Sequence, residues 1–391
     1  MRMKSKQRLI YGFLIILAVA EWWLFASTSK KSATPGSDFA ILYAGAKLAN
    51  ENPRALYDSQ TQFKVEQEVL QAPGWEARFL YPPFFALAIS PLGRMNYVAA
   101  YWAWTGFTAI LYAASILVLI REFRGNALIL ALVAVACPAF HWLILAGQTT
   151  VIALFLFVLI YLAMTRHLYS TTGALIALLA YRPQFMILLA PICLMKLPRA
   201  TLIGFFSMLF TLFVVGTMGL SLDSYARYFA LIQEITDLIR LAIHPLGLFI
   251  SAYALLRSLG SETLATSGSL VLGILLGFRL FVRWPSDYNL GRFSSWFASL
   301  ILATLLTMSY SLIYDLLLII PIIAFTFGVR GPQPIALAFL YCAPILYFFL
   351  GSGTINLSPI ALGWLFVAID RAYPKRYGTV IDLKTENISS S

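Results

Sequence analysis

The chain has 391 residues, of which 60% are hydrophobic and only 12% are charged, and its mean hydropathy is +0.80. A soluble globular domain carries about 25% charged residues, so this composition excludes a soluble protein and indicates an integral membrane protein. The net charge of +11 does not indicate nucleic-acid binding, because the basic residues are scattered through short loops between apolar runs.

The first apolar run covers residues 9–27 and follows a basic N-terminal segment. It has no convincing small-residue cleavage site, so we expect an uncleaved first span in place of a signal peptide. Basic residues favour the cytoplasmic side of a span, which puts the N-terminus in the cytoplasm and the long polar stretch 28–79 outside.

Two helices are predicted in this extracytoplasmic loop. Ser37-Asp38 indicates the start of the first one, which would lie along the membrane surface on one apolar face made by Phe39, Leu42, Tyr43 and Ala46. Asp58 is expected to cap a second helix over residues 59–71, which Pro73-Gly74 ends. The Glu66-Gln67-Glu68 run on that helix is expected to be a solvated face.

Asp38 has two interpretations. Aspartate is a leading N-cap residue, so its side chain can simply cap the first loop helix. A carboxylate near the membrane boundary can also act as a general base that deprotonates an acceptor hydroxyl. Spacing alone leaves both open.

The following run, 79–93, contains three prolines and is shorter than the roughly 20 residues that a span needs. It is predicted to be a re-entrant or half-inserted element, and the run 243–259 to be a second such element or an interfacial helix. The predicted fold class is all-α, with about twelve transmembrane helices. The first is the run 9–27, and the others are expected at 97–120, 126–145, 149–165, 168–181, 184–196, 200–221, 265–283, 293–308, 312–328, 333–350 and 354–370.

Alternate threading of these spans puts the basic short loops in the cytoplasm. Residues 1–376 are then one transmembrane domain, with 28–79 as its extracytoplasmic loop and 377–391 as a polar cytoplasmic tail. Both termini are expected in the cytoplasm and the protein in the cell (plasma) membrane. The three cysteines lie in apolar segments without a CxxC pair and are expected to be packing residues.

Three polar elements fall on the outer face in this topology: Gln148, Arg182 and the pair Tyr314-Asp315. An ionisable group at membrane depth is costly and usually faces a cavity with a function. Arg182 is predicted to bind a phosphate oxygen, whereas Asp315 can either share this function or pair with a buried arginine. His141 and His244 are weaker candidates, and no metal site or cofactor is expected.

The order of motifs DFAILYAGAKL, ALYD, FLYPPFFALAISPL, AGQTT, YRPQFMILLAP and SYSLIYDLLL resembles glycosyltransferase family 87, over about residues 10–350. This family belongs to the C-type superfamily of polytopic glycosyltransferases, and it includes polyprenyl-phosphate-mannose-dependent mannosyltransferases. The resemblance implies that Asp38 is the catalytic carboxylate and that Gly147-Gln148 and Arg182-Pro183 line the pocket of a donor arriving laterally from the membrane. Arg182 stands where the family often has lysine.

Relatives often carry Ser-Pro and a histidine near 309–315, and this chain has Tyr314 and Asp315 there instead. We count both as donor-binding candidates, together with Arg78 and Tyr81 at the Tyr-Pro-Pro turn. The expected reaction is metal-independent transfer of a hexose, mannose by resemblance, from a polyprenyl-phosphate donor to a lipid or glycan acceptor. The alternatives are a lipid or glycan transporter (flippase), disfavoured because no inverted repeat or paired broken helices stand out, and a lipid-diphosphate-dependent polysaccharide polymerase or ligase.

Overall fold

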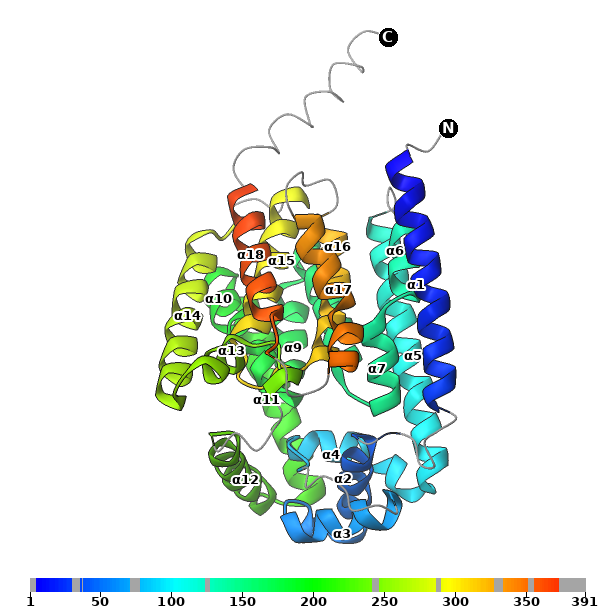
Figure 1. The fold of residues 1–391 in the computed structure, drawn as a ribbon. Coiled ribbons are helices and arrows are strands. Elements are labelled where there is room, and N and C mark those ends of the chain that lie inside the picture. Colours follow the sequence, from blue (N-terminus) through cyan, green and yellow to red (C-terminus); the bar gives the residue numbers. More distant parts are fainter. Residues whose placement is uncertain are drawn as a thin grey trace.

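The computed structural model of the protein describes residues 5–29, 36, 38–70, 78–123, 127–240, 246–285, 290–326, 333–350 and 355–372. These residues form helices and no strand, apart from one isolated antiparallel bridge between Phe249 and Leu312. The predicted all-α class is therefore confirmed. Most helices form a bundle, and a smaller layer of short helices lies at one end of it (Figure 1).

Among the described residues, three helices are long and apolar enough to cross a bilayer: α5 (Tyr97–Glu122), α11 (Arg199–Leu220) and α14 (Glu262–Val282). The bent pair α6 (Ala127–Val135) and α7 (Pro138–Ala146) adds a fourth if it counts as one span. Large apolar side chains on the outside of α11 and α14 are exposed, as a lipid-facing surface requires. A membrane-embedded protein is thus supported, while the count of twelve spans stays a prediction.

The other predicted spans correspond to apolar helices, several of them short. These are α1 (Ser5–Ser29), α8 (Thr150–Thr165), α9 (Tyr169–Leu178), α10 (Leu189–Lys196), α15 (Leu290–Thr307), α16 (Ile319–Thr326), α17 (Gln333–Leu350) and α18 (Ser358–Ala372). The start of α1 and the end of α18 lie at the same end of the bundle, opposite the layer of short helices (Figure 1).

The layer at the other end, which we call the outer layer, consists of α2 (Phe39–Glu51), α3 (Ser59–Leu70), α4 (Pro83–Ile89), the 3-10 helix η2 (Ser90–Arg94) and α12 (Asp223–Arg240). The two predicted loop helices are confirmed as α2 and α3. Asp58 caps α3, because its Oδ1 accepts a hydrogen bond from the Thr61 backbone N–H at 2.8 Å.

Helix α2 is more deeply buried than predicted. The expected face of Phe39, Leu42, Tyr43 and Ala46 is buried, but so are other sides of the helix. Helix η2 approaches it so closely that a Cβ on Gly93 would meet the α2 backbone at 2.5 Å. The expectation of a single buried face is therefore wrong, and α2 is an internal helix of the outer layer. Its position along the membrane surface stays a prediction.

Neither of the runs 79–93 and 243–259, which were predicted as re-entrant or interfacial elements, crosses the bundle as one helix. Residues 83–89 form only α4, and the described part of the second run forms the 3-10 helix η6 (Leu246–Leu248) and α13 (Ala252–Leu259). Both are far shorter than the roughly 20 residues needed to span a bilayer. The second run pairs with the segment before Asp315, where the Ile250 N–H donates to the Ser311 carbonyl at 2.9 Å.

Two breaks lie next to prolines, one within the predicted span 126–145 and one between the predicted spans 168–181 and 184–196. Helices α6 and α7 meet at 40° just before Pro138. Between α9 and α10 the chain passes through two 3-10 helices, η4 (Leu179–Tyr181) and η5 (Pro183–Met186), which meet at Arg182. The break at Pro138 was not predicted, because hydropathy continues through it, whereas the interruption at Arg182-Pro183 was predicted as a boundary between two spans. The argument against a transporter from an absence of paired broken helices therefore fails.

Candidate functional site

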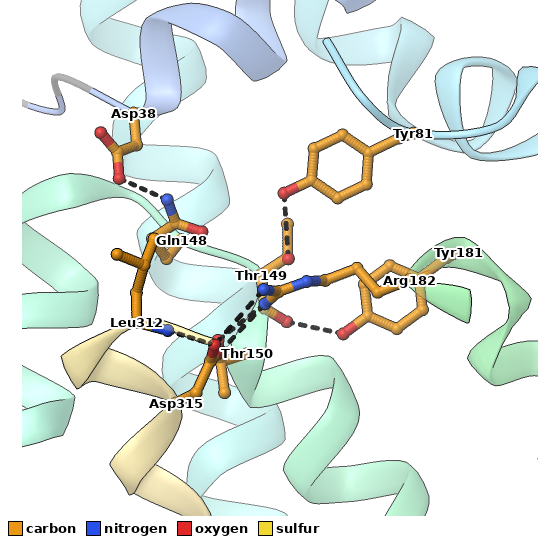
Figure 2. A network of polar contacts seen from close by, with 9 residues as sticks. All are labelled: Asp38, Tyr81, Gln148, Thr149, Thr150, Tyr181, Arg182, Leu312 and Asp315. Atoms are coloured by element: carbon orange, nitrogen blue, oxygen red, sulfur yellow. Dashed lines mark hydrogen bonds and ion pairs between the residues drawn. The ribbon is translucent and has the colours of Figure 1, made fainter. Parts of the chain in front are cut away.

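Asp38 does not use its side chain to cap α2. Its backbone is already helical, with φ −83° and ψ −21°, and the carboxylate makes no capping hydrogen bond. Instead the Gln148 Nε2 donates to Asp38 Oδ2 (Figure 2). The Asp38 backbone N–H donates to the Ala146 carbonyl at 3.0 Å. The capping interpretation is wrong for this residue, and the half-buried carboxylate is directed to another segment of the chain.

Gly147 allows α2 to approach the end of α7 this closely. It has φ +80°, in the left-handed region that favours glycine, and a Cβ there would lie 2.4 Å from Phe39 Cβ. Helix α5 holds the same turn from the side, because Trp104 Nε1 donates to the Gly147 carbonyl at 3.0 Å and the Tyr101 hydroxyl to the Ile144 carbonyl at 2.9 Å. The positions of Gln148 and Asp38 are thus fixed by the packing of three helices.

Arg182 and Asp315 form a buried ion pair. Arg182 Nη1 lies 3.1 Å from Asp315 Oδ1, and Nη2 lies 3.4 Å from Oδ2. Asp315 also accepts hydrogen bonds from the Thr150 hydroxyl at 2.5 Å and from the Leu312 backbone N–H at 3.0 Å. The latter fixes the start of the 3-10 helix η7 (Ile313–Leu318). The pairing that the sequence left open is therefore present.

Aromatic residues surround this ion pair. The guanidinium carbon of Arg182 lies 4.9 Å from the centroid of the Phe185 ring. Tyr81 and Tyr181 are nearly parallel, at 5° and 6.4 Å between centroids. Tyr310 and Tyr314 are close enough to Asp38 and Arg182 to interact with both electrostatically. The structure thus brings together Asp38, Tyr81, Gln148, Arg182, Tyr314 and Asp315 of the predicted site.

Arg78 belongs to a different environment. Its guanidinium lies 3.9 Å from the Glu234 carboxylate on α12, and it interacts with Glu66 on α3. These contacts place Arg78 in the outer layer, beside the segment that leads to Tyr81. Its predicted contact with the donor stays a prediction.

Glu66 corrects the expectation of a solvated face. Its side chain is only 2% exposed, and its Oε1 has no hydrogen-bond partner among the described residues. Burial raises the Glu66 pKa to about 8, although Arg78 acts in the opposite direction. The same face of α3 carries Gln62, whose Oε1 accepts from the Phe79 N–H at 3.0 Å. The segment 78–80 covers this face, which the sequence of α3 alone does not reveal.

A second buried polar contact lies inside the bundle, between α1 and α7. Glu21 Oε2 and His141 Nδ1 are 3.5 Å apart, and both side chains are almost fully buried. Sequence reasoning missed Glu21, because it is a single carboxylate within a long apolar run. His244 lies outside the described residues. Within the described parts of the chain, no group of three or more His, Cys, Asp or Glu side chains is arranged to hold a metal ion.

Sequence reasoning also missed Thr149, Thr150, Tyr181 and Tyr310. The available signal was the polar run Gln-Thr-Thr directly after an apolar span, of which only the glutamine was chosen. Threonine in an apolar helix usually bonds to its own backbone, so its sequence gives no sign of a tertiary partner. Cys137 and Cys193 are buried and Cys342 is partly buried, which agrees with the expected packing role.

The sequence matches glycosyltransferase family 87 over residues 79–309, which is more than half of the chain. Gln148 and Arg182 lie inside the matched region, whereas Asp38 and Asp315 lie outside it. No curated protein matches the chain, and no solved structure does. The chain belongs to glycosyltransferase family 87 and is a membrane glycosyltransferase.

Proposed function

We propose that this enzyme transfers a hexose, mannose by family resemblance, from a polyprenyl-phosphate donor to a lipid or glycan acceptor on the extracytoplasmic face, with Asp38 as the general base. One observation carries the proposal. The Asp38 carboxylate is not used for helix capping and is oriented by the Gln148 amide. A donor N–H on one oxygen fixes the carboxylate while the acceptor hydroxyl can meet the group from another direction.

The proposed step is an in-line displacement at the anomeric carbon. The acceptor oxygen forms the new bond to this carbon as its proton passes to Asp38, and the bond from the carbon to the phosphate oxygen breaks. The electron pair of that bond stays on the polyprenyl phosphate. Such a step needs a positioned base and stabilisation of the leaving phosphate, and no metal ion is required for it if a cation of the chain meets the phosphate.

Arg182 is our candidate for this cation. Its bonds to Asp315 and Thr150 come from Nη1 and one N–H of Nη2. The Nε–H and the second Nη2–H take no part in these bonds and can donate to a phosphate oxygen. Arg78, at the Tyr81 turn, is proposed as a further contact of the donor.

The charge of the site favours a monophosphate over a diphosphate donor. Asp315 offsets the charge of Arg182, and Asp38 adds a negative charge, so these three groups together carry no net positive charge. A lipid diphosphate would bring more negative charge into this buried site than a lipid phosphodiester does, and desolvating unpaired charge is costly. The polymerase or ligase alternative is therefore less favoured. Broken helices at the site would also suit a transporter, but membership of a glycosyltransferase family favours transfer.

The test is a transfer assay with purified full-length protein, radiolabelled polyprenyl-phosphate mannose and a lipid extract. Asp38→Asn keeps the shape of the side chain and should lower turnover by roughly 10²- to 10⁴-fold, the usual contribution of a general base. Asp58→Asn is the matched control, because Asp58 lies in the same loop and caps α3; it should retain activity.

Wild-type turnover by Asp38→Asn would rule out the proposed base. Reactions with a chelator test metal independence, and a sugar linked to polyprenyl diphosphate tests the donor class. Preference for the diphosphate donor would favour the ligase alternative. Accessibility of single cysteines placed at each end of the chain tests the proposed cytoplasmic termini in the plasma membrane.

A further inference from the structure

The turn between α7 and α8, residues Gln148–Thr150, bonds to segments that lie far apart in the sequence (Figure 2). Gln148 holds Asp38, and Thr149 contacts Tyr81 and Tyr181. Thr150 contacts the ion pair of Arg182 and Asp315. The proposed base and the proposed phosphate-binding cation are therefore attached to residues of one short turn.

We propose that Thr149 and Thr150 are positioning residues for glycosyl transfer. They hold the aromatic wall, which is formed by the rings of Tyr81, Tyr181 and Phe85, and the guanidinium of Arg182 at a fixed distance from Asp38. This inference rests on the proposed function, because it assumes that Asp38 and Arg182 act on the two ends of the reacting bond. Neither threonine needs to touch the substrate.

Thr150 is the third member of the buried ion pair. Its hydroxyl donates to Asp315 Oδ1 at 2.5 Å and accepts from Arg182 Nη1 at 3.1 Å. The hydroxyl hydrogen of Thr150 and one of its two acceptor lone pairs are therefore both used in hydrogen bonds to the ion pair. Without it, the guanidinium would keep its contact with Asp315 but would lose a bond that fixes its rotation.

Thr149 contributes a different contact. It stands at the N-cap position of α8, where threonine commonly bonds to the helix backbone, but its side chain makes no capping hydrogen bond. Its hydroxyl lies 3.2 Å from the Tyr81 hydroxyl, and its carbonyl accepts from the Tyr181 hydroxyl at 3.1 Å. The two rings lie near parallel and both stack against Phe85. Thr149 thereby sets the position of this aromatic wall beside Arg182.

These contacts act together because Gln148, Thr149 and Thr150 are consecutive residues of the chain. Consecutive Cα atoms are about 3.8 Å apart, so a base held by Gln148 and a cation held by Thr150 cannot drift apart independently. In-line transfer depends strongly on such positioning, and small displacements of reacting groups cost large factors in rate.

The experiment compares Thr150→Val with Thr150→Ser in the full-length enzyme, with the steady-state kinetics of donor use as the readout. Valine keeps the volume but removes the hydroxyl, so kcat should fall about tenfold or more, as expected for one charge-assisted hydrogen bond. Serine keeps both bonds and should stay within a few-fold of wild type. Thr108→Val is the matched control, because this buried hydroxyl bonds only to carbonyls of its own helix α5, and it should show wild-type kinetics.

Two further measurements separate positioning from general stability. If Thr150 acts through Arg182, Thr150→Val should cause no further loss of kcat in an Arg182→Gln background. Thr149→Val should weaken use of the donor as much as Tyr81→Phe does, and the double variant should be no worse. Wild-type kinetics of Thr150→Val, an additive loss with Arg182→Gln, or failure of serine to restore activity would each overturn the proposal. An active Asp38→Asn would instead overturn the proposed base, so the two failures are distinguishable.

Discussion

Replacing both members of the Arg182–Asp315 pair separates its structural from its functional contribution. Asp315 is fully buried and Arg182 is 6% exposed. Removing one charge leaves the other buried without its partner, which costs about 3–5 kcal/mol. We therefore expect Asp315→Asn and Arg182→Met, each alone, to lower the thermal stability of the protein strongly.

The double variant Arg182→Met with Asp315→Leu should behave differently. Replacing a buried ion pair by apolar residues of similar volume is often neutral or stabilises a protein by about 1–4 kcal/mol. Against this gain, the Leu312 N–H and the Thr150 hydroxyl lose their acceptor, at about 1–3 kcal/mol for each group left unsatisfied. Near the middle of these ranges the gain is about 2 kcal/mol and the two costs sum to about 4 kcal/mol, so the double variant should be about 2 kcal/mol less stable than the wild-type protein and more stable than either single variant.

Thermal unfolding in detergent and the transfer assay are measured on the same preparations. A double variant that is more stable than either single variant but gives no transfer would show that Arg182 acts in the reaction and not only in folding. Two results would refute the reasoning. One is wild-type transfer by the double variant, which would remove Arg182 from the donor site. The other is a double variant as unstable as the single ones, which would mean that the stability loss does not come from an unpaired charge.

Three further predictions concern Glu66 and Asp58 in the outer layer and Gly147 at the end of α7. Burial raises the pKa of Glu66 from its ordinary value of 4.5 to about 8, so the contribution of Glu66 to stability is greatest below pH 4.5 and decreases by up to about 5 kcal/mol as the pH rises through 8. Glu66→Gln should remove this contribution from the pH profile of thermal melts, and parallel profiles of variant and wild type would contradict it. Gly147→Ala should lower the free energy of unfolding by about 1–2 kcal/mol for its left-handed backbone alone, and by more because of the contact with Phe39. The transfer activity of the protein that stays folded should fall as well. Asp58→Ala should cost about 1 kcal/mol through loss of its cap on Thr61, while the turnover number stays unchanged.

The sequence was sufficient to select several residues that the structure brings together, although their roles stay predictions. Asp38, Gln148, Arg182 and Asp315 were chosen because each is a polar residue at an end or a break of an apolar run, and the structure brings all of them into one network. This works because hydropathy fixes the boundaries of spans, and backbone that leaves a helix at membrane depth must line a cavity or lie within protein. The place of a residue along an apolar span therefore predicts its depth in the bundle.

Tertiary partners could not be read in the same way. Glu66 looked solvated because its neighbours Gln67 and Glu68 are polar, and only the segment 78–80 shows that its face of α3 is covered. Arg78 was grouped with the site because it is close to Tyr81 in sequence, but its side chain turns toward Glu234. In both cases the deciding contact comes from another element, and periodicity within one helix contains no information about that element.

Asp38 and Thr149 both depart from the local preference of their residue type, and both lie in the candidate site. Asp38 and Thr149 stand at N-cap positions with capping-competent side chains, yet neither caps its helix. An N-cap bond contributes about 1 kcal/mol, and both side chains instead make hydrogen bonds to other segments of the site. Departures from local rules in natural proteins are expected at functional sites. Asp58, by contrast, has the same opportunity in the same loop and caps α3 in the ordinary way, which is why we assign catalysis to the first aspartate and not to the second.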